Sequence, residues 1–176
     1  MPAALDLPSW RLPRRLRPLL LERGSLTDRL AERCPGGEIY VQVLHEGWSL
    51  ASHDECRRLG LPGRRVWIRE VLLQCGEQNW VHARSLVPPE SFHALKRALC
   101  GLGSQPLGRL LFTWQGQRCG RILLCRDAQG HFGRISRFTI RGRSIWVGER
   151  FLGNLCTNAK IPDRRMDAPT RDGPGH

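Results

Sequence analysis

Two charged residues of this sequence each share a predicted strand face with apolar neighbours alone, and both could do chemistry. Arg69 lies within residues 66–73 and Glu149 within residues 145–152. Because strand side chains alternate between two faces, each charge would share its face with apolar neighbours. A charge in such a place is costly unless it pairs with an opposite charge or meets a ligand. Two interpretations follow: Arg69 and Glu149 form a buried salt bridge, or they belong to a ligand site.

The side-chain chemistry suits the binding of a small organic acid. The planar guanidinium of Arg69 can hold a carboxylate through two parallel hydrogen bonds. Glu149 could accept a hydrogen bond from a substrate hydroxyl, or serve only as a counter-ion. Arg84, on the next predicted strand, would supply a second cation beside Arg69 for a dianionic ligand, although a surface arginine fits equally well. Leu107 lies at a predicted helix start, where free backbone N–H groups can bind a carboxylate.

The elements that position these residues form a single α+β domain over residues 1–153, followed by a polar, disordered tail over 154–176. Consecutive hairpins predict an antiparallel sheet. The pattern predicts a helix over 11–23 that Pro13 and Pro18 break or kink, short helices over 25–33 and 106–112, a longer helix that begins at Pro89, and an irregular connection over 47–65 that allows a helical turn near 54–59. Strands are predicted over 38–46, 66–73, 79–87, 121–125, 133–140 and 144–152.

Composition excludes several classes of protein. No run approaches the roughly 20 apolar residues of a membrane span, so we expect a cytoplasmic protein. The seven cysteines are an odd number without any CxxC pair, which argues against a metal site and favours reduced thiols in a reducing compartment. The sequence shows neither a dinucleotide fingerprint nor a P-loop, so no cofactor is expected. The net charge of +12 raises nucleic acid as a partner, but the basic residues are dispersed and many fall in turns.

Several motifs in order give the chain a resemblance to a known family, chorismate pyruvate-lyase, over about residues 20–153. The motifs are Trp67-Ile68-Arg69-Glu70-Val71-Leu72-Leu73, Ala83-Arg84-Ser85-Leu86-Val87-Pro88, Leu102-Gly103-Ser104-Gln105-Pro106-Leu107-Gly108-Arg109-Leu110-Leu111-Phe112, Arg126-Asp127, Gly133-Arg134-Ile135-Ser136-Arg137 and Glu149-Arg150-Phe151-Leu152.

The resemblance implies a monomer with a six-stranded antiparallel sheet and a ligand buried beneath two helical flaps. Family members convert chorismate to 4-hydroxybenzoate and pyruvate for ubiquinone synthesis, without metal or cofactor. The family's ligand-binding arginine falls on Arg69, its leucine backbone contact on Leu107 and its glutamate on Glu149. Arg84 matches an arginine near the pocket, and a first-flap contact falls near Leu26. We therefore expect Arg69 and Glu149 to be catalytic, and Arg69, Leu107, Glu149 and Arg84 to bind substrate.

The sequence departs from the family at Ala83, where some relatives have glycine, and in the tail, which has no recognised counterpart. Two other functions stay open. A class of bacterial transcriptional regulators uses a similar fold as a non-catalytic effector-binding domain, but normally with a winged helix upstream, for which the segment before residue 38 is too short. A basic nucleic-acid-binding module would need aromatic residues on an exposed strand face.

Overall fold

The structure is a computed structural model that describes residues 11–153 and 155, and the predicted tail over 154–176 lies almost entirely outside them. Six strands form one antiparallel sheet in the order β1-β2-β3-β6-β5-β4. This arrangement confirms the predicted α+β class with its antiparallel sheet. The strands are β1 (Tyr40–Leu50), β2 (Arg65–Cys75), β3 (Gln78–Val87), β4 (Gln117–Arg126), β5 (Phe132–Ile140) and β6 (Arg143–Phe151).

Five helices accompany the sheet within the described residues, and local capping explains where several of them begin. In α2 (Leu26–Ala31) the Ser25 hydroxyl accepts a hydrogen bond from the Asp28 backbone N–H at 3.2 Å and so caps the start of the helix. Pro89 opens the longest helix. The remaining helices are α1 (Arg17–Leu20), α3 (His53–Leu59), α4 (Pro89–Cys100) and α5 (Leu107–Thr113).

Three elements differ from their predicted extent. Of the segment 11–23, predicted as a helix broken or kinked by its prolines, only the single turn of α1 is helical, and Pro18 lies in its first turn, where proline is tolerated. The strand predicted over 38–46 continues through Gly47 to Leu50, because β1 pairs with β2 along its whole length. The helical turn predicted near residues 54–59 is a complete helix, α3, whose start is a full capping box between Ser52 and Glu55.

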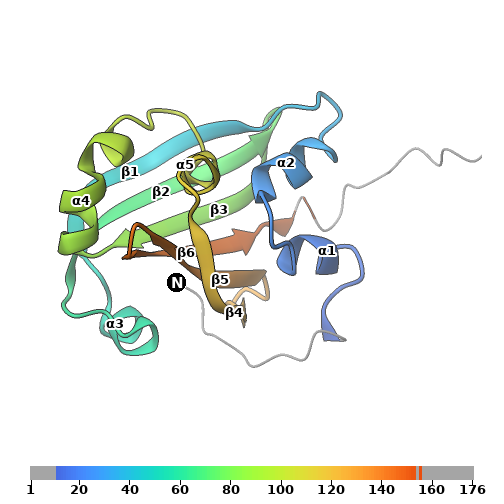
Figure 1. Ribbon diagram of the computed structural model, residues 1–176. Coiled ribbons are helices and arrows are strands. Elements are labelled where there is room, and N and C mark those ends of the chain that lie inside the picture. Colours follow the sequence, from blue (N-terminus) through green and yellow to red (C-terminus); the bar gives the residue numbers. More distant parts are fainter. Residues whose placement is uncertain (1–10, 154, 156–176) are drawn as a thin grey trace, which may run out of the picture.

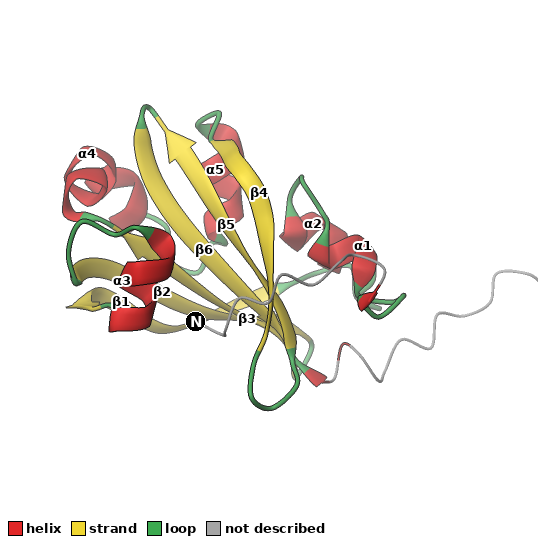
Figure 2. Cartoon of the chain, turned by 90° about the horizontal axis from the view of Figure 1, so that it is seen from below, coloured by secondary structure: helices red, strands yellow, loops and turns green. Residues whose placement is uncertain are grey.

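The helices are distributed unequally over the two faces of the sheet. Helix α3 covers one face, where Leu59 packs with Ile68 and Leu86. The other face carries α1, α2, α4 and α5, and both views show α2 and α5 as neighbours over the sheet (Figures 1 and 2). Two separate apolar clusters lie on this second face. One forms beneath α1 and α2, and the other beneath α4 and α5.

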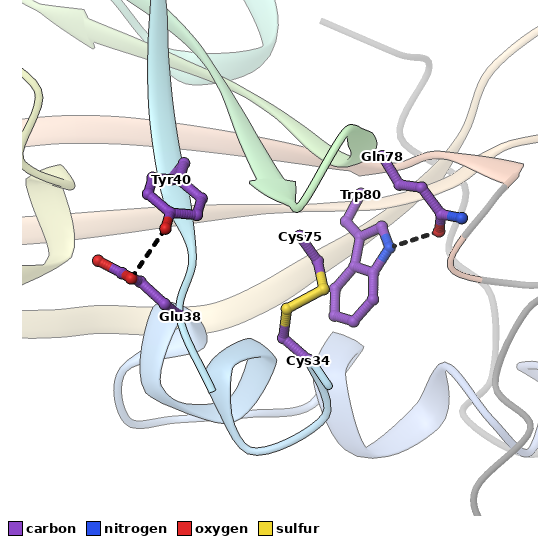
Figure 3. The surroundings of a disulfide bond; sticks show 6 residues. All are labelled: Cys34, Glu38, Tyr40, Cys75, Gln78 and Trp80. Carbon is purple, nitrogen blue, oxygen red and sulfur yellow. Dashed lines mark hydrogen bonds between the residues drawn. A yellow bond between two sulfur atoms is a disulfide. The ribbon is translucent and has the colours of Figure 1, made fainter. Parts of the chain in front are cut away.

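A disulfide corrects the expectation that the thiols are reduced. Cys34, which follows α2, is bonded to Cys75 at the end of β2, with their Cα atoms 5.7 Å apart. Trp80 lies beside this bond (Figure 3). The two cysteines are 41 positions apart in the sequence, so only the folded β1–β2 pairing reveals that they meet. Cys56, Cys100, Cys119 and Cys125 are free thiols.

Across the part of the chain that the structure describes, no helix is both long enough and apolar enough to cross a membrane.

Candidate functional site

A cavity of about 50 Å³ with a mostly apolar lining lies on the second face of the sheet, where its two apolar clusters meet. On β2, Arg69 follows Trp67 of one cluster and precedes Val71 of the other. On β6, Glu149 stands between Val147 and Phe151 in the same way. Arg69 and Glu149 therefore both lie at the boundary between the two clusters and line the same cavity. Its polar or charged lining includes Arg69, Ser85, Arg118, Arg134 and Glu149, and Leu107 closes it from α5.

Arg69 is 2% exposed. It attaches the α4–α5 segment, one of two segments that cover the cavity, to the sheet. Its Nη1 forms an ion pair with Glu46 on β1, while Nη2 donates to the carbonyls of Gly103 at 2.7 Å and Gln105 at 3.0 Å. These carbonyls belong to the α4–α5 loop, which turns at Gly103 with φ +51°. The hydrogen bonds that Arg69 makes within the described chain use Nη1 and Nη2, and none of them uses Nε. This N–H is thus available for a ligand.

Leu107 stands where the sequence predicted it, at the first position of α5 and on the pocket wall. An N–H in the first turn of a helix has no acceptor within that helix. Arg69 holds the preceding loop through its two carbonyl contacts. The side chain of Arg69 and the start of α5 therefore face the same end of the cavity.

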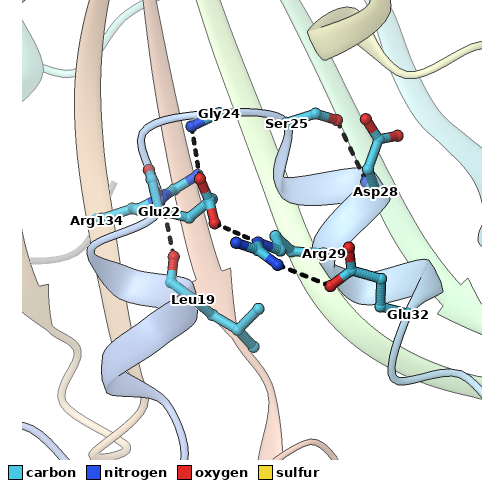
Figure 4. Close-up of polar contacts among 8 residues, drawn as sticks. All are labelled: Leu19, Glu22, Gly24, Ser25, Asp28, Arg29, Glu32 and Arg134. Carbon is cyan, nitrogen blue, oxygen red and sulfur yellow. Dashed lines mark hydrogen bonds and ion pairs between the residues drawn. The ribbon is translucent and has the colours of Figure 1, made fainter.

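Glu149 lies at the other end of the cavity and is paired with Arg134, its direct partner in the β5–β6 register. Arg134 is 1% exposed, and its Nη1 donates to the carbonyls of Leu19 at 2.9 Å and Glu22 at 2.6 Å (Figure 4). These carbonyls belong to α1 and the α1–α2 loop. Arg134 thus attaches the α1–α2 segment to the sheet, as Arg69 attaches the α4–α5 segment.

The α1–α2 loop is further ordered by the carboxylate of Glu22. It accepts hydrogen bonds from the Gly24 N–H at 2.7 Å and from Arg29 Nε at 2.6 Å (Figure 4). These two contacts hold the pKa of Glu22 below its ordinary value. Gly24 and Leu26 line the cavity. Leu26, near which the first-flap contact was expected, therefore does lie against the pocket.

The salt bridge between Arg69 and Glu149 that the sequence left open does not form. Each residue has a different partner, Glu46 for Arg69 and Arg134 for Glu149. Both nevertheless line the same cavity. The first interpretation is therefore wrong, and the second, in which the two residues belong to one ligand site, stays a prediction that the shared cavity allows.

Arg118 on β4 is a pocket residue that the sequence analysis did not single out. Its Nη1 donates to the Ser136 hydroxyl, and its guanidinium lies 4.5 Å from the ring centroid of Phe138. Its Nε is buried and has no acceptor in the described chain. Burial lowers the pKa of Arg118, and the positive charge of Arg134 lowers that pKa further.

Arg84 does not lie beside Arg69, contrary to expectation. Arg69 is paired with Ser85 in the β2–β3 register, so Arg84 projects from the opposite face. There it forms ion pairs with Glu55 of α3, at 2.9 Å, and with Glu70. The second and third cations of the cavity are instead Arg118 and Arg134.

Replacing Arg84 with glutamine should lower stability without weakening ligand binding in the cavity. The variant deprives Glu55, which is 3% exposed, of a charged donor, at a cost of about 1–3 kcal/mol. Thermal unfolding at neutral pH measures this loss. Binding of 4-hydroxybenzoate, the small acid that the resemblance implies, should be unchanged. Weakened binding in a folded variant would contradict the placement of Arg84 away from the cavity.

The same variant should change how stability depends on pH. Burial raises the pKa of Glu55, but the Ser52 N–H and Arg84 outweigh it and bring that pKa down to about 2. A carboxyl whose pKa is lower in the folded state stabilises the fold above its ordinary pKa of 4.5, and that contribution is lost as the pH falls toward 2. Arg84→Gln should therefore lose less stability over this acid range than the parent chain.

The residues from 11 to 153, together with 155, contain no cluster of three His, Cys, Asp or Glu side chains suited to a metal ion.

Comparison with known proteins identifies the family. Residues 9–161 match the model of the chorismate lyase family. A protein of Pseudomonas aeruginosa named "Probable chorismate pyruvate-lyase" is 36% identical over 155 residues, which are 82% of this chain and 86% of that protein. A protein of Halorhodospira halophila with the same name is 40% identical over 151 residues, covering 76% and 79% of the two chains.

A solved structure supports the fold. The effector domain of PhnF from Mycobacterium smegmatis superimposes with a TM-score of 0.53 at 13% identity, over 76% of this chain and 91% of that one. At this identity the likeness concerns the fold alone. The family match and the identity to its curated members are the stronger findings. This chain belongs to the chorismate lyase family.

Proposed function

We propose that this protein is a chorismate pyruvate-lyase, which eliminates pyruvate from chorismate and leaves 4-hydroxybenzoate. One observation supports this function above the others: Arg69 and Glu149 stand at two ends of a single cavity within an apolar face. Family membership and the names of the relatives point to the same reaction. As the resemblance implies, the product would supply ubiquinone synthesis in the cytoplasm, and the protein would act as a monomer.

The spacing of the strands suits an aromatic acid with polar groups at both ends. Arg69 on β2 and Glu149 on β6 are separated by β3, a distance of about 10 Å at two strand spacings. A benzene ring with a carboxylate and a hydroxyl in para positions, and a hydrogen bond at each end, spans this length. The ring carboxylate would accept from Arg69 Nε and the Leu107 N–H. The ring hydroxyl would donate to Glu149.

The reaction is an elimination that balances without a redox partner. The ether bond between the ring and the enolpyruvyl group breaks, and the ring carbon that bears the hydroxyl loses its hydrogen as a proton. The departing enolpyruvyl oxygen keeps the bonding electrons, and protonation converts the fragment to pyruvate. The ring becomes aromatic, which drives the reaction. The protein then contributes mainly positioning and preorganised charge.

Glu149 is placed to do more than anchor the hydroxyl. Beside the hydroxyl-bearing carbon, its carboxylate lies next to the hydrogen that is lost. Arg134 fixes the orientation of that carboxylate from the neighbouring strand. We assign Glu149 the acceptance of this proton, with Arg134 as the residue that positions it.

The two covering segments would act as the flaps that the resemblance implies. The cavity of about 50 Å³ is smaller than typical ligand pockets, which hold roughly 300–1,000 Å³. A substrate would therefore need more space than this cavity has, and movement of the α1–α2 or the α4–α5 segment away from the sheet would provide it. Each segment is held by two carbonyl contacts to one buried arginine. Reclosure around the ligand would exclude water from the reaction.

Purified full-length protein should release pyruvate and 4-hydroxybenzoate in equal amounts from chorismate, without added metal. Pyruvate can be followed by a coupled dehydrogenase assay, and 4-hydroxybenzoate by chromatography of the same samples. A reaction without protein corrects for the spontaneous decay of chorismate. Tight binding of 4-hydroxybenzoate without any turnover would contradict the enzyme and favour the effector-binding function. Strong, salt-dependent binding of nucleic acid without turnover would favour the basic module.

A further inference from the structure

Arg118 is the one pocket-lining arginine in the described chain that has no carboxylate partner. Arg69 is paired with Glu46, and Arg134 is paired with Glu149. Arg118 makes only a neutral hydrogen bond, to the Ser136 hydroxyl, and its buried Nε has no acceptor there. A buried guanidinium with unmet donors is costly. A second anion in the cavity would remove this cost.

The position of Arg118 places such an anion at the Glu149 end of the cavity. Arg118 extends from β4 to Ser136 on the neighbouring strand β5. The register partner of Ser136 on β6 is Val147. Glu149 is the next residue of β6 on the same face. The charges of Arg134 and Glu149 both act on Arg118. Arg69, by contrast, belongs to β2, with β3, β6 and β5 between it and β4.

Chorismate carries two carboxylates, and the placement proposed above uses only the ring carboxylate. The second belongs to the enolpyruvyl group, whose ether oxygen is attached to the ring carbon next to the hydroxyl-bearing carbon. With the hydroxyl at Glu149, this second carboxylate necessarily lies toward the Glu149 end. We propose that Arg118 binds the enolpyruvyl carboxylate of the substrate. This inference rests on the proposed function and adds the residue that recognises the leaving group.

With this assignment, Arg118 binds a carboxylate of the substrate and none of the product. Chorismate presents a carboxylate to Arg118, whereas 4-hydroxybenzoate has only the ring carboxylate that Arg69 would hold. Arg118 therefore selects for the dianion over the monoanion. It also holds the enolpyruvyl group in one orientation while its ether bond breaks. The contact between Arg118 and Phe138 fixes the guanidinium for this purpose.

Replacing Arg118 with glutamine tests this role, because it affects the two ligands differently. The kcat/KM for chorismate should fall by about ten- to a hundredfold, the effect of one charged hydrogen bond. The Kd for 4-hydroxybenzoate, measured by calorimetry on the same preparation, should be unchanged. Arg118→Lys keeps the charge and should recover part of the loss. Arg126→Gln is the matched control: it removes an exposed arginine of β4 that contacts the Gly130 carbonyl rather than the cavity, and should change neither value.

The outcomes separate this inference from the proposed function. An Arg118→Gln variant that keeps the parent kcat/KM overturns the role of Arg118 alone. Equal losses for chorismate and 4-hydroxybenzoate also overturn it, because they show a general change in the pocket. If the parent protein itself releases no pyruvate from chorismate, the proposed function fails, and the inference that rests on it fails as well. Unchanged product affinity with a selective loss for chorismate supports Arg118 as the second carboxylate site.

Discussion

Arg69→Gln should abolish most of the turnover of chorismate and weaken the binding of 4-hydroxybenzoate by about ten- to a hundredfold. The amide cannot offer a carboxylate the charged donors of the guanidinium. It also cannot reach both Gly103 and Gln105, so the α4–α5 segment loses its attachment to β2. Steady-state kinetics measure the first effect, and calorimetric titration with 4-hydroxybenzoate measures the second.

Stability needs its own control, because Arg69 also belongs to a buried ion pair. Breaking such a pair costs about 3–5 kcal/mol when both charges are buried, and less here because the Glu46 side chain is 28% exposed. Glu46→Gln removes the ion pair and keeps the guanidinium. It should lower the unfolding temperature and preserve product binding. An Arg69→Gln variant that folds and binds 4-hydroxybenzoate as tightly as the parent would show that Arg69 does not hold the carboxylate.

Glu149→Gln should reduce kcat by about a hundredfold or more, the range of general acid–base catalysis, and change KM little. The amide oxygen can still accept from Arg134 and from the ring hydroxyl, so positioning is kept. Only the ability to accept a proton is lost. Rapid-quench or steady-state kinetics with chorismate separate kcat from KM. Glu149→Leu would instead leave Arg134 buried without its carboxylate and should also lower stability.

The kinetic pattern decides between two roles for Glu149. A raised KM with kcat retained would mean that the carboxylate only anchors the hydroxyl, and the assignment of proton acceptance would be wrong. Glu22→Gln is the matched control. It neutralises a carboxylate of the covering α1–α2 loop that contacts Gly24 and Arg29 rather than the cavity. We expect its kcat to stay near that of the parent, because it removes a loop contact and no reacting group.

The pattern of side chains was sufficient to predict the sheet and its two conspicuous charges. Hairpins impose strict alternation, so an isolated charge in an apolar run must point into the core or into a site. Arg69 and Glu149 follow this rule and share one face. Leu107 was predicted because proline marks a helix start locally, and Pro106 directly precedes it. Their roles in binding and catalysis stay predictions until the variants are measured.

The remaining features depended on relations between distant segments. Whether Arg84 lies on the same face of the sheet as Arg69 depends on the β2–β3 register, which pairs Arg69 with Ser85. The side-chain patterns of two half-apolar strands do not determine the register between them. Arg134 could have been found, since the β5–β6 hairpin alone places it opposite Glu149. Arg118 could not have been found from the alternation of side chains, because a register shift between Cys119 and Leu123 separates it from the rest of β4.

The bond between Cys34 and Cys75 also has a consequence for the chain before it folds. It closes a covalent ring that contains β1, α3 and all of β2, and therefore both members of the Glu46–Arg69 pair. Across 41 positions, the loss of conformational entropy in the unfolded chain corresponds to about 4 kcal/mol in the chain-entropy model. The proposed carboxylate-binding arginine thus belongs to a part of the chain whose freedom is restricted even when the sheet is absent.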